Sequence, residues 1–263
     1  MQIDGAHVLL TGASGGLGRA IARELSLRGA HLTLTARNME VLEELADQTG
    51  GEAVACDLDD RAQVSALCER LAGVDVLVAN AGIGGGGEGA DTRVEEIDRV
   101  LDVNLRAPMV LTTEFARRHR GGGGGGGGGG RTAQVVLVGS LHGLVTSPTT
   151  SLYNATKFGL RGFSLAMRQD LASRGIGVSL VAPGFVRDHG LFADSGVELP
   201  RFVRTKSPRD VAEGVVRAIT TNPPEVFVSP FELWASAMLG SMAPGLSETF
   251  QRRLGVAEMT DER

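Results

Sequence analysis

Short apolar runs alternate along this chain with longer stretches in which apolar residues recur at helical spacing. The apolar runs predict strands at residues 7–11, 31–36, 52–56, 75–79, 133–139, 177–182 and 226–229. The helical spacing predicts helices at residues 16–28, 40–48, 61–71, 94–118, 152–173 and 208–221. Nearly continuous apolar strands between helices are typical of a parallel sheet covered on both faces. The pattern therefore predicts an α/β fold, a doubly wound parallel sheet of about seven strands with helices on both faces.

Two glycine-rich stretches interrupt this pattern. Residues 121–130 are consecutive glycines between a predicted helix and a strand, with no side chain to bury and much backbone entropy to lose. We expect a disordered surface loop there, at the end of the sheet opposite to any ligand. Residues 84–87 fall at the ligand end, where the stretch either influences access to a site or is a passive loop.

Length and charge narrow the class of protein. The 263 residues suit one α/β domain with a full core. We expect the main unit at 1–230, with 231–263 an apolar helical extension of the same domain. Twenty-six basic against 31 acidic residues give a net charge of −5, so neither nucleic acid nor an anionic membrane is an expected partner. Cys56 and Cys68 lack metal or redox spacing and are expected as buried thiols, and no metal is expected.

The chain enters its first predicted strand within a few residues of Met1, which leaves no room for a signal peptide. No stretch approaches the roughly 18 consecutive apolar residues that indicate a membrane helix. We therefore expect a cytoplasmic protein without a transmembrane segment.

A glycine-rich turn follows the first predicted strand and precedes an amphipathic helix. It reads Gly12-Ala13-Ser14-Gly15-Gly16-Leu17-Gly18. Gly12 permits a tight turn, Gly16 lets the backbone approach a phosphate, and Gly18 allows close packing of helix on strand. The exposed N–H groups and the positive end of the helix dipole then suit a pyrophosphate. The turn predicts a dinucleotide site.

A second motif points to acid–base chemistry. Tyr153 and Lys157 are four residues apart in a predicted helix, so their side chains lie on one face. A nearby ammonium favours the phenolate, and we expect it to lower the pKa of Tyr153 from its usual value of about 10. Ser140 precedes this pair and follows a predicted strand. A tyrosine whose pKa is lowered in this way can exchange a proton near neutral pH, as general catalysis requires.

Together these motifs resemble those of the short-chain dehydrogenase/reductase family over about residues 5–230. The residues that match the family in order and spacing are Thr11, Gly12, Gly16, Gly18, Asn80, Ala81, Gly82, Asn104, Ser140, Tyr153, Lys157, Pro183 and Gly184. The resemblance implies a single-domain Rossmann-like fold and hydride transfer between a nicotinamide cofactor and a carbonyl or alcohol. It also implies a homodimer or homotetramer, associated through the helices that carry Asn104 and Tyr153.

The choice of cofactor depends on the residue after the second strand, where NAD enzymes usually carry a carboxylate. Here that place holds Arg37, which can pair with the 2′-phosphate of NADP or simply face solvent. We expect NADP(H) in preference to NAD(H). The resemblance places Asp57 and Leu58 against the adenine and Asn80 near the adenosine ribose. The other implied cofactor contacts are at Thr11, Gly12, Ser14, Gly15, Gly16, Leu17, Gly18, Ala81, Gly82, Tyr153, Lys157, Pro183, Gly184 and the backbone of Val186.

The resemblance also assigns the chemistry. Tyr153 would protonate the carbonyl oxygen, Lys157 would lower the Tyr153 pKa and bind the nicotinamide ribose, and Ser140 would position that oxygen. Asn104 kinks its helix and holds a proton-relaying water in relatives; the alternative is a satisfied buried amide. Asp188 stands where many relatives carry Thr, and a carboxylate near the phosphates is unfavourable unless it points away or pairs with Arg187.

Substrate contacts are sought near Ser140 and in a lid at 185–207. The candidates are Ser140, His142, Phe185 and Phe192, with solvent-facing or structural roles as the alternative for His142. The apolar segment from Pro230 packs on the domain, caps an apolar pocket, meets a partner or lies on lipid. A cap would suit a lipophilic substrate.

These expectations describe an NADPH-dependent oxidoreductase of the carbonyl reductase type, acting on a ketone, an aldehyde or a secondary alcohol. A non-catalytic nicotinamide-binding regulatory protein and a lyase or epimerase are the alternatives, because a fold does not fix a function. The intact set of Ser140, Tyr153, Lys157 and Asn104 argues against a protein that only binds the cofactor.

Overall fold

The computed structural model describes residues 1–85, 89–119, 133–188, 204–245 and 248. Its strands are β1 (His7–Thr11), β2 (His31–Ala36), β3 (Glu52–Ala55), β4 (Val76–Ala79), β5 (Ala133–Val138), β6 (Ile176–Pro183) and β7 (Glu225–Val228). Its α-helices are α1 (Gly16–Ser26), α2 (Met39–Thr49), α3 (Arg61–Glu69), α4 (Val94–Leu101), α5 (Ala107–Arg118), α6 (Ser151–Ala172), α8 (Pro208–Thr221) and α9 (Phe231–Met242). The predicted alternation of strands and helices is confirmed.

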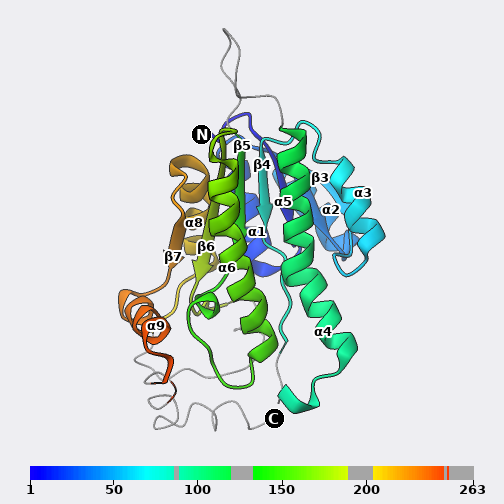
Figure 1. Ribbon diagram of the computed structural model, residues 1–263. Coiled ribbons are helices and arrows are strands. Elements are labelled where there is room, and N and C mark those ends of the chain that lie inside the picture. Colours follow the sequence, from blue (N-terminus) through cyan, green and yellow to red (C-terminus); the bar gives the residue numbers. More distant parts are fainter. Residues whose placement is uncertain (86–88, 120–132, 189–203, 246–247, 249–263) are drawn as a thin grey trace.

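All strands are parallel and lie in one sheet, in the order β3-β2-β1-β4-β5-β6-β7 (Figure 1). The chain runs outward from β1 in one direction and, after β3, returns to continue outward from β4 in the other. Such a reversal opens a crevice at the carboxyl ends of the two central strands, where ligands bind in doubly wound sheets. The predicted fold is confirmed, and the order places the crevice between β1 and β4.

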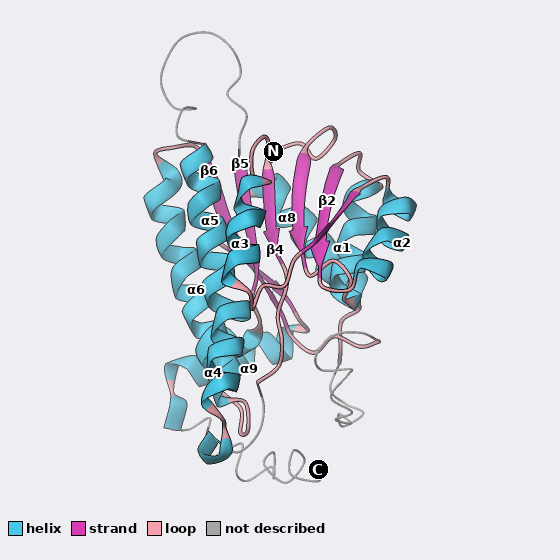
Figure 2. Ribbon diagram, turned by 90° about the vertical axis from the view of Figure 1, so that its right-hand side faces the viewer, coloured by secondary structure: helices cyan, strands magenta, loops and turns pink. Residues whose placement is uncertain are grey.

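Helices cover both faces of the sheet (Figure 2). On one face, Val8 and Leu10 of β1 pack with buried residues of α1, α2 and α8. On the other, Leu9 packs with residues of α3, α5 and α6. This alternation follows from the pleat of a strand, which sends successive side chains to opposite faces. Because both faces of the central strands are buried, these strands are largely apolar, which is why the sequence revealed them.

The predicted helix at 94–118 has the expected bounds, but its middle is not α-helical. Between α4 and α5 the chain forms a π-helical segment, η2 (Asp102–Arg106). A π-turn holds one more residue than an α-turn and often marks a functional site. Here it contains Asn104, whose side chain bonds outside the helix. The helical periodicity continues through the segment, so the sequence pattern did not reveal it.

Several other expectations concern the described part of the chain. Cys56 and Cys68 are buried free thiols, as predicted, and burial raises the pKa of Cys56 to about 11. None of the helices in the described ranges has the length and apolar character needed to cross a bilayer. The predicted loop at 121–130 and the glycines at 86–87 lie outside the described residues.

Candidate active site

The glycine turn forms where β1 meets α1, at the central crevice. Gly12 has φ +66°, and a Cβ there would lie 2.7 Å from the Cα of Ala81. A Cβ on Gly18 would lie 2.7 Å from the Cα of Ala13. Neither position accommodates a larger residue without displacing backbone. The turn thus brings Gly15, at the N-cap of α1, to the end of the crevice, with free helix N–H groups suited to a phosphate.

The loop after β4 is fastened to this turn. The Asn80 side-chain amide donates to the carbonyl oxygens of Thr11 at 3.0 Å and Gly12 at 3.2 Å. The Thr11 hydroxyl accepts from the backbone N–H groups of Asn80 and Ala81. The Asn80 Oδ1 atom is buried and has no hydrogen-bond partner among the described residues. Since a buried acceptor without a partner is costly, this atom suits a ligand hydroxyl, as a ribose would supply.

The residues expected at the adenosine end lie beside the turn. Arg37 directly follows β2, is exposed, and has no ion pair or side-chain hydrogen bond within the described ranges. The next residue, Asn38, accepts from the Val41 N–H and caps α2. Leu58 is buried, and Asp57 is half-buried after β3. The chain thus offers an apolar surface and an unpaired guanidinium at the same end of the sheet.

The four residues expected to be catalytic lie close together. Ser140 follows β5, Tyr153 and Lys157 lie on α6, and Asn104 lies in η2. Lys157 Nζ donates to the carbonyl oxygen of Val138 at 3.2 Å and lies 5.4 Å from the centroid of the Tyr153 ring. A Cβ on Gly82 would lie 3.5 Å from Lys157 Nζ and 3.6 Å from Asn104 Oδ1. The spacing of motifs along the sequence therefore becomes a cluster in space.

The expected lowering of the Tyr153 pKa is wrong for the side chain as it lies in this structure. Burial raises the pKa of Tyr153 to about 12, against a smaller lowering by the Ser140 side chain. Burial also lowers the pKa of Lys157 to about 8. Burial thus disfavours the charged form of each residue. At neutral pH the phenol therefore carries its proton.

The side chain of Asn104 is a buried amide with hydrogen-bond partners for both its oxygen and its nitrogen. Its Oδ1 accepts from the N–H of Ile83 and its Nδ2 donates to the carbonyl oxygen of Ile83, both at 2.8 Å. Nδ2 also lies 3.3 Å from the hydroxyl of Thr156 on α6. The amide therefore ties η2 to the loop after β4 and to the helix of Tyr153 and Lys157.

Ser140 begins a short 3-10 turn, η3 (Leu141–Gly143), and its hydroxyl accepts from the N–H of His142 at 3.1 Å. The His142 ring lies between two hydroxyl groups, with Nδ1 3.4 Å from Ser140 Oγ and Nε2 3.3 Å from Ser147 Oγ. The ring also meets Tyr153 edge to face, with centroids 5.6 Å apart. His142, proposed from sequence as a substrate contact, thus touches two members of the cluster.

Asn154 is a site residue that the sequence analysis missed. It is buried beside Tyr153, and its Nδ2 donates to the carbonyl oxygens of His142 and Val145, both at 2.9 Å. It therefore fixes η3 and the following loop on α6. A polar residue next to the catalytic tyrosine was the available signal, but α-helical spacing alone gives no indication of which backbone groups it would meet.

The segment after β6 closes the other side of the crevice. Gly184 donates to the carbonyl oxygen of Val228, and Val186 is buried and bridges to Lys206. In that bridge Lys206 bonds the backbone of Phe185 and Arg187, so the N–H and C=O of Val186 point the other way.

Asp188, which stands where many relatives carry Thr, lies beside the guanidinium of the preceding residue. Its carboxylate lies 3.5 Å from Arg187 Nε, one of the two arrangements expected to relieve it, and its φ is +70°. Pro183, the end of β6, is buried, and Phe185 is half-buried. Phe192 and most of the expected lid lie outside the described residues.

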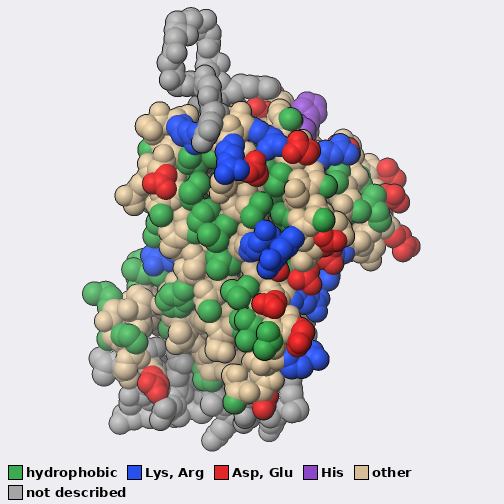
Figure 3. Space-filling view, turned by 45° about the vertical axis from the view of Figure 1, so that its right-hand side comes forward, with side chains coloured by type: hydrophobic (Ala, Val, Ile, Leu, Met, Phe, Trp, Pro, Cys, Tyr) green, Lys and Arg blue, Asp and Glu red, His purple; other side chains and the backbone are tan. Residues whose placement is uncertain are grey.

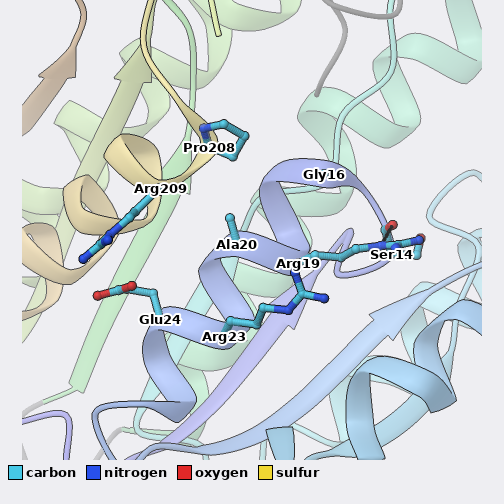
Figure 4. Close-up of a pocket in the computed structure, with 8 residues that line it drawn as sticks. All are labelled: Ser14, Gly16, Arg19, Ala20, Arg23, Glu24, Pro208 and Arg209. Atoms are coloured by element: carbon cyan, nitrogen blue, oxygen red, sulfur yellow. Dashed lines mark hydrogen bonds between the residues drawn. The ribbon is translucent and has the colours of Figure 1, made fainter. Parts of the chain in front are cut away.

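A pocket of about 510 Å³ lies against the outer side of the glycine turn, between α1 and the start of α8 (Figure 4). Arg19 spans it and donates through Nε to the carbonyl oxygen of Ser14 at 2.9 Å. Arg23, Glu24 and Arg209 also line the pocket, with Glu24 pointing to the side of Arg209 and Arg23 away from it. Ser140, Tyr153, Lys157 and Asn104 do not line this pocket, so it is separate from the candidate chemistry. The bond from Arg19 to Ser14 instead supports the glycine turn.

Comparison with known proteins adds the last observations. A family model described as short chain dehydrogenase matches residues 6–194. The ketoacyl reductase HetN of Nostoc sp. is 32% identical over 277 aligned positions, covering 99% of this chain and 93% of the relative. The 3-oxoacyl-acyl-carrier-protein reductase FabG of Rickettsia bellii is 32% identical over 189 positions, covering 71% of this chain and 75% of the relative. A solved short-chain dehydrogenase from Sphingobium yanoikuyae in complex with NADPH is similar with a TM-score of 0.76 at 26% identity, covering 98% of this chain and 96% of that one.

Proposed function

Given that this chain belongs to the short-chain dehydrogenase family, we propose that it is an NADPH-dependent reductase of ketones or aldehydes, or the alcohol dehydrogenase that is its reverse. The family makes it an oxidoreductase that uses a nicotinamide cofactor. The observation that carries the finer proposal is the meeting of Ser140, Tyr153, Lys157 and Asn104 beside the crevice between β1 and β4.

The proposed NADPH site uses features that fit the cofactor. The glycine turn presents N–H groups to the pyrophosphate, and the buried Oδ1 of Asn80 accepts from the adenosine ribose. Arg37 pairs with the 2′-phosphate, since it is exposed and bears a charge without a partner in the described part of the chain. Lys157 holds the nicotinamide ribose, and the backbone of Val186 holds the carboxamide. The bound cofactor supplies the hydride.

The chemical roles follow from the protonation states. Tyr153 is protonated at neutral pH, since even the usual tyrosine pKa of about 10 lies well above 7, and it can give its proton to the carbonyl oxygen. As Tyr153 loses that proton, the ammonium of Lys157 stabilises the phenolate that forms. Ser140 donates to the same oxygen and holds it in place. Asn104 holds the loop that follows β4 against α6, and Lys157 on that helix then faces Gly82 in the loop.

We propose a 3-oxoacyl thioester as the substrate class to test first. The printed names of two relatives are those of ketoacyl reductases, and one of them spans nearly the whole chain. The residues of α9 support an apolar substrate, because Ala237, Leu233 and Met238 pack against Leu141 and Leu144, next to Ser140. An apolar wall therefore borders the site where an acyl chain would lie.

Association of two or four copies through α4, α5 and α6 is a further part of the proposal. Large apolar side chains are exposed on these helices at Val94, Ile97, Met109 and Phe158. Figure 3 views a face on which hydrophobic side chains gather over these helices. An apolar surface shared by adjacent helices is suited to a second copy.

Replacing the proposed acid tests this function directly. With acetoacetyl-coenzyme A, wild-type protein is expected to consume NADPH, followed by its absorbance. In Tyr153→Phe, kcat is expected to fall by about 100-fold or more, because general acid catalysis is worth about 10²–10⁴. NADPH affinity, measured by fluorescence titration, is expected to stay within about threefold, since Phe keeps the ring and loses only the hydroxyl.

Two outcomes would contradict the proposal. If Tyr153→Phe turns over at the wild-type rate, the proton comes from another group. If wild-type protein binds NADPH and reduces neither acetoacetyl-coenzyme A nor any of a panel of cyclic and aromatic ketones, the chain is not a carbonyl reductase. The non-catalytic and lyase alternatives then become the ones to test.

A further inference from the structure

The hydroxyl of Ser140 can donate one hydrogen bond and accept two. One acceptor position is taken by the N–H of His142, at 3.1 Å. The Nδ1 atom of the same residue lies 3.4 Å away and is either a donor to Ser140 or an acceptor from it. Which of these holds decides whether the proton of Ser140 is free for another oxygen.

We propose that His142 is a positioning residue, held as its Nδ1–H tautomer between Ser140 and Ser147, which keeps the Ser140 proton available to the substrate oxygen. In this arrangement Ser147 donates to Nε2, and Nδ1–H donates to Ser140. Both acceptor positions of Ser140 are then filled by His142, and its one proton is left for the side on which Tyr153 and the substrate oxygen lie. This inference rests on the proposed function and adds His142 and Ser147 to it.

The opposite tautomer gives the opposite result. With the proton on Nε2, the Ser140 hydroxyl would donate to Nδ1 and have no proton to offer a carbonyl oxygen. The Ser147 hydroxyl accommodates either form, since it donates to Nε2 when that nitrogen carries no proton and accepts from it when it does. Ser140 favours the first tautomer, because its side chain also hydrogen-bonds Tyr153, and a Ser140 proton directed to that oxygen leaves Nδ1 to act as the donor. Contacts of 3.3 and 3.4 Å are long for hydrogen bonds, as such contacts often are before a substrate binds.

The ring is held firmly enough to act in this way. Asn154 binds the carbonyl oxygen of His142, and Tyr153 lies against the ring at an interplanar angle of 74°. A Cβ on Gly143 would lie 2.8 Å from the carbonyl oxygen of Lys157, which shows how closely η3 is packed on α6. Burial and the charge of Lys157 both lower the pKa of His142, so the ring is neutral at pH 7 and has one proton to place.

Nitrogen-15 NMR of the imidazole rings tests the tautomer without any assay of activity. The chain has five histidines, and the signal lost in His142→Phe identifies the one of interest. At pH 7 we expect a neutral ring with the proton on Nδ1, and a shift toward the Nε2–H tautomer in Ser140→Ala, which removes the acceptor of Nδ1–H. A ring with its proton on Nε2, or a doubly protonated ring, in wild-type protein would overturn the inference.

Steady-state kinetics with acetoacetyl-coenzyme A tests the consequence. His142→Phe keeps the aromatic contact with Tyr153 but has no donor, and its kcat is expected to fall about tenfold, the effect of about 1.4 kcal/mol, with KM within about twofold. His142→Asn places an amide donor near Nδ1 and is expected to recover most of the rate. A fall of kcat without recovery by Asn, or a rise of KM alone, would indicate a structural or substrate-binding role instead.

A double-mutant comparison separates action through Ser140 from general damage. In a Ser140→Ala background, His142→Phe is expected to cost less than twofold, since the group through which it acts is gone. An undiminished loss in that background would overturn the inference. If wild-type protein reduces no carbonyl, the proposed function fails and this inference with it. If wild-type protein is active and His142→Phe equals it, only the inference fails.

Discussion

Burial is the largest cause of the pKa shifts of Tyr153 and Lys157. Lys157 is 4% exposed, and burial lowers its pKa from the usual 10.5 to about 8. The sequence showed that Tyr153 and Lys157 share a helical face, but it could not show how deeply the face is buried. The direction expected for the Tyr153 pKa was therefore wrong, although the pairing itself is present.

This lowered pKa makes stability depend on pH. Between pH 8 and 10.5 the unfolded chain binds a proton at Lys157 that the folded chain lacks, so stability rises with pH in that window. Relative to Lys157→Met, the wild-type free energy of unfolding is expected to increase by about 2–3 kcal/mol from pH 8 to pH 10. The raised pKa of Tyr153 acts in the opposite direction only above its usual value of 10.

Urea denaturation of both proteins at several pH values measures this difference. Groups other than Lys157 titrate in both proteins, so their contributions largely cancel in the comparison. A difference between the two proteins that is independent of pH would mean that Lys157 keeps its ordinary pKa in the folded state.

Arg37 is the residue on which cofactor preference is expected to depend. Losing a hydrogen-bonded contact with a charged group costs about 1.5–3 kcal/mol. We therefore expect Arg37→Ala to raise KM for NADPH by about 10- to 100-fold, and KM for NADH by less than about threefold. Arg70→Ala is the matched control, since Arg70 is also exposed but pairs with Glu52. Equal losses for both cofactors would refute a 2′-phosphate contact.

At the scale of the element, the close approach of η3 to α6 sets the distance between Ser140 and its partners. A Cβ on Gly143 would meet the backbone of Lys157, whereas one on Gly162, exposed on the same helix, would meet nothing within 4 Å. The two glycines thus provide a substitution and its control. Sequence reading gave neither of them a role, because their difference depends on which backbone lies opposite.

Gly143→Ala is expected to reduce the free energy of unfolding by about 1–3 kcal/mol through this overpacking. It is also expected to lower kcat with little change in NADPH affinity, because the glycine turn lies elsewhere. Gly162→Ala should instead add about 0.5–1 kcal/mol, since Ala favours the helix. Equal stability of the two variants, measured by urea denaturation, would show that η3 can shift without cost.

The strands and most helices were predictable because a sheet buried on both faces leaves an apolar run at each strand. The glycine turn and the Tyr153 and Lys157 pair were predictable because their chemistry is local in sequence. The π-turn at η2 was not, since it is stabilised by the bonds from Asn104 to Ile83, two residues that are distant along the chain. Contacts of that kind depend on tertiary packing, which a single sequence does not encode in readable form.

At the scale of the whole molecule, the doubly wound order brings together residues that are far apart in sequence. Thr11, Asn80 and Pro183 all stand at the carboxyl ends of strands or just beyond them, so one edge of the sheet carries the entire candidate site. The helix surfaces that face away from the sheet lie outside this site. The exposed apolar side chains of α4, α5 and α6 fall on such a surface (Figure 3).

This surface leads to a prediction about association. Met109 and Phe158 are 37% and 42% exposed on α5 and α6, so a glutamate at either would place a charge in the proposed interface. Wild-type protein is expected to have two or four times the chain mass of 27.4 kDa by light scattering. The pair of substitutions Met109→Glu and Phe158→Glu is expected to shift it to a monomer, because an unpaired buried charge costs several kcal/mol.

Leu239→Glu is the control for that experiment. Leu239 is 68% exposed on α9, away from the three helices, so its replacement is expected to leave the mass unchanged. A monomeric wild-type protein would contradict the proposed assembly outright. If Leu239→Glu dissociates the protein while the Met109 and Phe158 variant stays associated, the interface lies at α9 and not at α4, α5 and α6. Because α9 packs beside the loop of Ser140, association there would join the active sites of two copies.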